Sequence, residues 1–150
     1  MKKFRFSLET VLDYKQQALD ALRAEHGAIL ARVRAQEEVV DGLEREYRQV
    51  DADFTRRKLE GLTVLDALNY EQYLRSLERE IQEERHKLEQ LRRQEDQKRA
   101  QVIEARKETA TIEKLKEHKL EDYRKAEQKD EEQRIEEFVS NTRALAGADI

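Results

Sequence analysis

Metal binding or acid–base catalysis in this sequence would have to involve its 3 histidines and its many carboxylates, because cysteine is absent. Glu83 and His86 form a single Glu-x-x-His motif, which places a carboxylate and an imidazole on one face of a helix. A di-metal carboxylate bundle needs two such motifs together with two further glutamates on facing helices. In a chain this rich in glutamate, we therefore interpret the single motif as part of a solvated helix face.

The other two histidines also have non-catalytic interpretations. His26 lies on an apolar stripe, where a polar residue typically sets the register of a coiled coil. His118 lies in a lysine-rich stretch that implies no partner for it. The 4 glycines are far apart, so they form no glycine-rich phosphate loop. The sequence thus predicts no catalytic residue, no metal site, no cofactor and no enzymatic activity.

The composition indicates a long coiled coil rather than a globular domain. Charged residues make up 43% of the 150 residues, aromatic residues make up 6%, and proline is absent. The 30 basic and 34 acidic residues are interleaved, so there is no one-sided field, and we expect no nucleic-acid partner. Polar residues interrupt the segment after Lys3, so we expect no export signal and no transmembrane segment. Together with the absence of cysteine, this favours the cytoplasm.

One short stretch divides the helical pattern into two arms. Gly61 can adopt the left-handed conformation that ends a helix. Basic residues precede it, where their charge interacts favourably with the negative C-terminal end of the helix dipole. Thr63 and Asp66 resemble a capping box that starts the next helix, with Leu62 as the apolar residue before the cap. We expect an all-α fold in which two long helices form an antiparallel coiled-coil hairpin, with the bend near residues 59–63.

Apolar residues at four-three spacing define the two arms. The first stripe comprises Leu8, Leu12, Lys15, Leu19, Leu22, His26, Ile29, Val33, Gln36, Val40, Leu43, Tyr47, Val50 and Phe54, and a second follows from Tyr70 to Ile112. If the chain folds back at the bend, the numbers of facing residues should sum to roughly 124, which pairs Leu43 with Ile81 and Val33 with Leu91. Charged positions at Glu84, Glu95 and Lys98 weaken this match and allow the register to slip.

These patterns predict a single domain over residues 1–150. Its parts are a first helix at about 8–58, a turn at 59–63, a longer second helix at about 64–143, and a frayed terminus at 144–150. By the same pairing, Phe4 and Phe6 could fold back onto Leu120 and Tyr123. Beyond them lies an apolar patch on the second helix that nothing in the chain covers, comprising Ile135, Phe138, Val139 and Leu145. We interpret this patch as a docking site.

Aromatic residues also gather just below the bend. Gln36, Leu43 and Tyr47 lie on the first arm, and the second arm carries Tyr70, Tyr73 and Leu77. Tyrosine is frequent at binding hot spots, so part of this cluster could face a partner. The alternative is that these rings fill wide layers of the coiled coil, which is the favoured interpretation for Tyr47 taken alone. Because Tyr70 and Tyr73 are three residues apart, we expect at least one of them to be exposed.

Three stretches in this order resemble the FliJ proteins of the bacterial flagellar type III export apparatus. They are FRFSLETVLD at 4–13, NYEQYLRSL at 69–77, and KLEDY at 119–123 followed by DEE at 130–132 and Phe138. The resemblance covers nearly the whole chain. It implies an antiparallel coiled coil that is similar to the central stalk of rotary ATPases and lies at the cytoplasmic face of the inner membrane, at the flagellar base.

The resemblance also implies partners and sites. The partners would be the hexameric flagellar export ATPase, the cytoplasmic domain of the export gate membrane protein, and the export chaperones. The gate-binding residues would be Gln36, Leu43, Tyr47, Tyr73 and Leu77. The paired termini would enter the ATPase ring through Phe4, Phe6, Leu120, Tyr123, Ile135, Phe138 and Val139. A stalk protein of a virulence-type secretion system and a generic coiled-coil scaffold without an ATPase partner remain alternatives.

Overall fold

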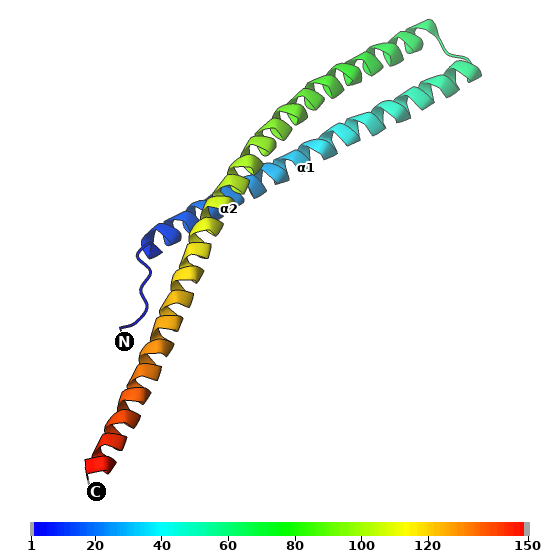
Figure 1. The fold of residues 1–150 in the computed structure, drawn as a ribbon. Coiled ribbons are helices and arrows are strands. Elements are labelled where there is room, and N and C mark those ends of the chain that lie inside the picture. Colours follow the sequence, from blue (N-terminus) through cyan, green and yellow to red (C-terminus); the bar gives the residue numbers. More distant parts are fainter. Residues whose placement is uncertain (1, 149–150) are drawn as a thin grey trace. The chain divides into compact units, whose positions relative to one another are not determined.

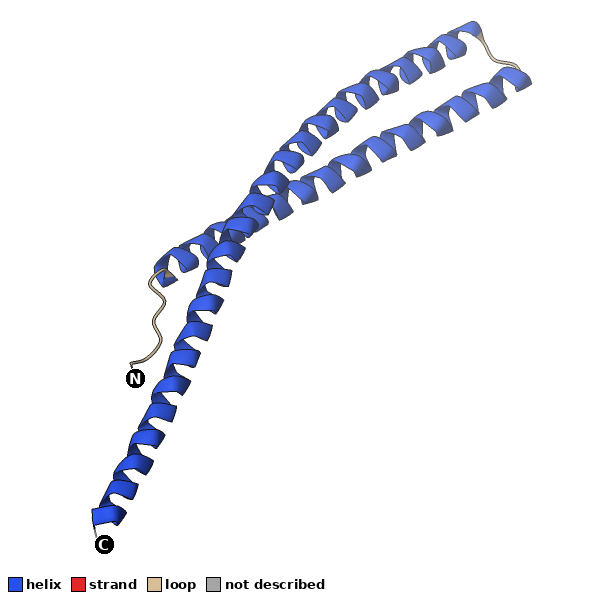
Figure 2. Cartoon of the chain, in the orientation of Figure 1, coloured by secondary structure: helices blue, strands red, loops and turns tan. Residues whose placement is uncertain are grey.

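The computed structural model describes residues 2–148 as two helices joined by a short turn. Helix α1 spans Glu9–Glu60 (52 residues) and helix α2 spans Val64–Ala148 (85 residues), as Figures 1 and 2 show. This confirms the all-α hairpin and its longer second helix. Helix α2 continues past the expected end near residue 143 to Ala148, while residues 149 and 150 of the expected frayed terminus lie outside the described part.

The contacts divide the chain into two compact units, which are described separately. The unit Asp20–Ile103 contains the turn and the parts of α1 and α2 adjoining it. The other unit combines the chain up to Leu19 with the chain from Glu104 onward. Below, these are called the hairpin unit and the terminal unit.

The turn has the stop and start interactions that the sequence predicts. Gly61 has a φ of 103°, a positive angle that side-chain-bearing residues rarely adopt. The hydroxyl oxygen of Thr63 accepts a hydrogen bond from the Asp66 backbone N–H at 3.2 Å, and the Thr63 carbonyl accepts one from the Ala67 N–H at 3.0 Å. Thr63 is therefore the N-cap of α2, one residue before the helix begins.

Apolar residues from both stripes form the core of the hairpin unit. Val33, Val40 and Leu88 form one cluster, and Ile29 and Leu91 pack against it. The inclusion of both Val33 and Leu91 agrees with the register predicted from the bend. Nearer the turn, the buried apolar side chains are Phe54, Leu74, Leu77 and Ile81. In the terminal unit, Leu12 and Leu19 are buried, together with Thr109.

The polar residues of the first stripe each contact an acidic residue of α2. The amide of Gln36 donates to the Glu84 carbonyl at 3.0 Å and also to the Glu84 carboxylate. His26 Nε2 lies 2.9 Å from Oε1 of Glu95. In the terminal unit, Lys15 Nζ lies 2.9 Å from Oε2 of Glu108. The three interruptions of the apolar stripe are thus satisfied across the seam.

The charged positions on α2 therefore define the register instead of allowing it to slip. Glu95 is only 6% exposed and also accepts hydrogen bonds from Arg99. Lys98 pairs with Glu25 at 2.8 Å. Sliding the helices would separate Glu95 from His26 and Glu84 from Gln36, and it would leave half-buried polar groups without partners.

The carboxylate of Glu95 makes stability depend on pH in a defined direction. Hydrogen bonds from Arg99, and then from His26, lower the pKa of Glu95 from 4.5 to about 2. This carboxylate therefore stabilises the fold fully above pH 4.5, and its contribution is lost as the pH falls toward 2. We expect Glu95→Gln to lower the melting temperature at pH 7, with the difference from wild type shrinking between pH 4.5 and 2. Circular dichroism melts across this range test it, and a pH-independent difference would contradict it.

Gly61 in the turn and Gly27 inside α1 are expected to respond in opposite ways to substitution by alanine. A Cβ at Gly61 would meet no atom within 4 Å, so the cost of Gly61→Ala arises from the positive φ alone, about 1–2 kcal/mol. Gly27 lies inside α1 with equally open surroundings, and Gly27→Ala should stabilise the protein by about 0.5–1 kcal/mol. Urea unfolding measures both changes. Equal effects of the two substitutions would show that the turn does not require a glycine.

Candidate functional site

The residues predicted to bind the export gate lie in the hairpin unit and differ widely in exposure. Tyr73 is 45% exposed, which meets the expectation that Tyr70 or Tyr73 faces solvent. Gln36, Leu43 and Tyr47 are half-buried. Leu77 is only 3% exposed and belongs to the core. The structure therefore brings these residues together along the seam, but Leu77 can support this surface only from beneath.

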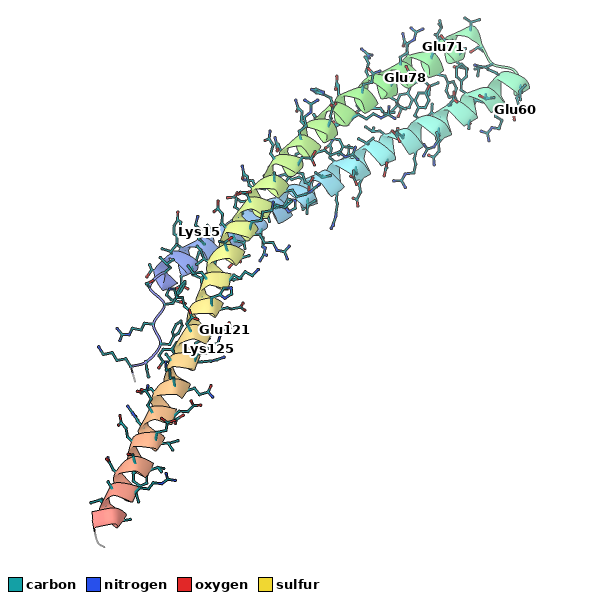
Figure 3. The ribbon with its side chains drawn as sticks, in the orientation of Figure 1. Lys15, Glu60, Glu71, Glu78, Glu121 and Lys125 are labelled. Atoms are coloured by element: carbon teal, nitrogen blue, oxygen red, sulfur yellow. The ribbon has the colours of Figure 1, made fainter. Side chains whose placement is uncertain are left out.

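Hydrogen bonds to carboxylates hold the tyrosines of this surface in place. The hydroxyl of Tyr47 donates to Oε1 of Glu78 at 2.9 Å, and that of Tyr73 donates to the Glu46 carboxylate (Figure 3 labels Glu78). These bonds raise the pKa of Tyr47 and the pKa of Tyr73, because they favour the neutral phenol. Each ring is consequently tied to the opposite helix with its hydroxyl at the rim of the seam.

An aromatic layer lies between this surface and the turn. Phe54 and Tyr70 stack with their ring centroids 5.0 Å apart and their planes at 7°. The Tyr70 hydroxyl donates to Oδ2 of Asp53 at 2.7 Å, and the Lys58 ammonium lies 3.7 Å from the centroid of the Phe54 ring. The predicted register does place Phe54 opposite Tyr70, whereas the charged residues that enclose the rings were not predicted.

A groove of about 390 Å³ runs beside Tyr47 on the same unit. Its lining carries both signs of charge, because it includes Glu44 and Glu78 as well as Arg48 and Arg85, and Arg85 pairs with Glu44. Ile81 contributes the apolar floor. The charges of these lining residues balance, and the open groove lacks the enclosure that acid–base catalysis needs.

The residues predicted to enter the ATPase ring lie in the terminal unit and form two groups. In the first group, the rings of Phe4 and Tyr123 lie 5.6 Å apart at 54°, and the Tyr123 hydroxyl donates to the carbonyl of Lys2. Phe6 and Leu120, which are close to Phe4 and Tyr123 in the sequence, are also half-buried. The expected return of the N-terminal segment onto α2 is thus confirmed for Phe4. A salt bridge of 2.8 Å between Lys116 and Glu9 also links the two segments.

The second group is exposed on the end of α2. Every residue from 131 to 147 is exposed, and the large apolar side chains among them include Ile135 at 61%, Phe138 at 71% and Leu145 at 70%. Val139 is 42% exposed. These side chains have no cover within the described residues, as the sequence predicted.

A further exposed apolar group at the turn was not predicted. It consists of Leu59, Val64, Leu65 and Leu68, whose exposed fractions range from 51% to 86%. These residues lie off the four-three stripes, so a search for core positions passes over them. In the sequence, their position off the stripe is the one feature that indicates that they face outward.

The histidine and carboxylate side chains of the described residues are dispersed. Within residues 2–148, no group of three or more His, Cys, Asp or Glu side chains is placed to hold an ion. His86 instead lies 3.2 Å from the amide nitrogen of Gln90 on the exposed side of α2. In the same range, neither helix contains a stretch apolar and long enough to cross a membrane.

Comparison with known proteins identifies the chain. A family model described as "Flagellar FliJ protein" matches residues 4–146. No match was found among curated proteins or among solved structures. The family match covers almost the entire sequence, including both helices, the turn and the exposed end of α2. The chain therefore belongs to the FliJ family and is a non-catalytic component of the bacterial flagellar protein export apparatus.

Proposed function

We propose that this protein binds the hexameric flagellar export ATPase as a stalk, links it to the export gate, and escorts export chaperones. The observation that carries the proposal is the uncovered apolar end of α2, where Ile135, Phe138 and Val139 are exposed. Exposed apolar groups of this size on an otherwise polar helix favour a protein partner. The proposed location is the cytoplasmic face of the inner membrane, at the flagellar base.

The proposed mechanism follows from a mismatch of symmetry. Two helices of unequal length cannot present the same contacts to six equivalent ATPase subunits. A ligand shifts a conformational equilibrium only by binding the alternative states with different affinity. Unequal contacts would therefore favour different conformations in different subunits of the ring, and thereby promote hydrolysis.

The proposed gate surface comprises Gln36, Leu43, Tyr47 and Tyr73, with Leu77 supporting it from the core. Tyr73 supplies the exposed ring, and the hydrogen bond to Glu46 restricts its rotation before binding. Little rotamer freedom would then be lost on contact with the gate protein. The match to a flagellar family is why we propose the flagellar apparatus over a virulence-type secretion system or an unrelated scaffold.

The ATPase role predicts a specific loss of stimulation. We expect the protein to accelerate ATP hydrolysis by the cognate export ATPase, and Phe138→Ala/Val139→Ala to remove most of this effect, because both side chains are exposed for docking. Steady-state ATPase assays measure the change. Leu59→Ala/Ile103→Ala is the matched control, since it removes two exposed apolar side chains that lie outside the end of α2. Equal losses with the two variants would contradict docking through the end of α2.

The gate role predicts that one exposed tyrosine matters more than another. Tyr73→Ala should weaken binding to the cytoplasmic domain of the gate protein by about tenfold or more, the range of interface hot spots. Tyr14 is 69% exposed on α1 and lies outside the proposed surface, so Tyr14→Ala should leave affinity unchanged. Isothermal titration calorimetry with each variant makes the comparison. Wild-type affinity of Tyr73→Ala would remove the gate surface from the proposal.

A further inference from the structure

The first turns of α2 carry an apolar face that points away from the seam. Val64, Leu65 and Leu68 are 78%, 69% and 51% exposed, whereas Leu74 in the seam is buried. At about 100° per residue, the three exposed side chains share one side of the helix, and the seam positions lie on the other. They form a surface that α1 does not cover.

A basic stretch continues this face along α2. The same four-three spacing passes from Leu65 and Leu68 through Gln72 to Arg75 and Arg79, and it meets no acidic residue. All of these side chains are exposed. Among the described residues, Arg75 and Arg79 take part in no ion pair, unlike Arg85 and Arg92. We call Val64, Leu65, Leu68, Arg75 and Arg79 the tip face.

The far end of the same helix carries the complementary pattern. Glu131 and Glu132 lie one turn before Ile135, Phe138 and Val139, and all five fall on one side of α2. Neither glutamate forms a salt bridge within the described part, and Glu132 only accepts a 3.4 Å hydrogen bond from Gln128. We call these five residues the tail face.

The two faces have opposite charge and opposite order. Along α2 the tip face changes from apolar to basic, whereas the tail face changes from acidic to apolar. An antiparallel pairing that sets Leu68 against Val139 also sets Arg75 against Glu132, because both intervals have the same length. Leu68 then covers Val139, and Arg75 meets Glu132. Arg79 falls opposite Gln128, one turn from Glu131, and Leu65 falls opposite Thr142, one turn from Phe138, so both lie beside tail-face residues of matching character.

We propose that the tip face of one molecule binds the tail face of a second copy of this chain. Matching charge, polarity order and spacing indicate a second copy rather than an unrelated apolar partner. Each face is small, so we expect weak self-association, with a Kd on the order of 10 µM. The inference goes beyond the proposed function and does not rest on it. Phe138 and Val139 also belong to the proposed ATPase surface, so a tail held by a second copy is withheld from the ring.

Charge-swap variants test the pairing in the full-length protein without any ATPase. Sedimentation equilibrium of wild type between roughly 5 and 200 µM should show a mass that rises with concentration. Arg75→Glu/Arg79→Glu and Glu131→Arg/Glu132→Arg should each weaken association at least about tenfold, because like charges then face each other. Combining all four substitutions should restore it. Arg32→Glu/Arg34→Glu, on exposed positions of α1, is the matched charge control and should associate as wild type does.

A second measurement reports the contact itself. Because the protein contains no cysteine, Leu68→Cys and Val139→Cys molecules can be mixed and oxidised, and a disulfide between them is expected. Leu68→Cys mixed with Tyr14→Cys is the control. The proposal is overturned if wild type stays monomeric up to roughly 200 µM, or if the four-substitution variant remains dissociated while circular dichroism shows it to be fully helical.

Discussion

The register of the hairpin depends on a few polar side chains that meet across the seam. Apolar layers alone tolerate a shift by one heptad, because one leucine or valine packs nearly as well as the next. His26 against Glu95 and Gln36 against Glu84 do not tolerate it, since a shift would strand each group without its partner. Arg99 strengthens this effect by holding the Glu95 carboxylate ionised within the seam.

The surfaces near the turn inherit their geometry from that register. Tyr47 reaches Glu78, and Tyr73 reaches Glu46, only because the two helices are aligned at this one setting. A tyrosine fixed by a hydrogen bond on the opposite helix is a rigid contact, and rigid aromatic contacts lose little entropy when a partner binds. The polar layers therefore act on binding indirectly, through the positions of side chains that they do not touch.

The sequence predicted the elements better than it predicted the roles of individual residues. Gly61, Thr63 and Asp66 located the turn because helix termini have local chemistry, and the paired stripes gave the register because it follows from the turn. The pairing rule sets the apolar Val40 and Ile29 opposite Glu84 and Glu95, so the charged layers look like a weakness in the sequence. In the structure each carboxylate instead reaches a polar residue about one turn along α1, Gln36 or His26. Leu77 lies on the stripe, as four-three spacing predicts, and is buried. The spacing alone does not separate it from a stripe residue such as Tyr47 that reaches the rim, because it fixes the rotation of each helix only approximately.

A two-helix hairpin can cover only one stripe on each helix. Its apolar residues therefore fall into two groups, those buried in the core and those left exposed to solvent. Those on the stripe, such as Leu77 and Leu88, are buried by the chain itself and contribute to stability. Those off the stripe, or past the reach of α1, remain exposed whatever the stability of the fold, as Leu65 and Phe138 do. Burial of such side chains requires another polypeptide. Binding in this protein is therefore expected to concentrate at the residues that its own core leaves uncovered, with the polar seam fixing where those residues are presented.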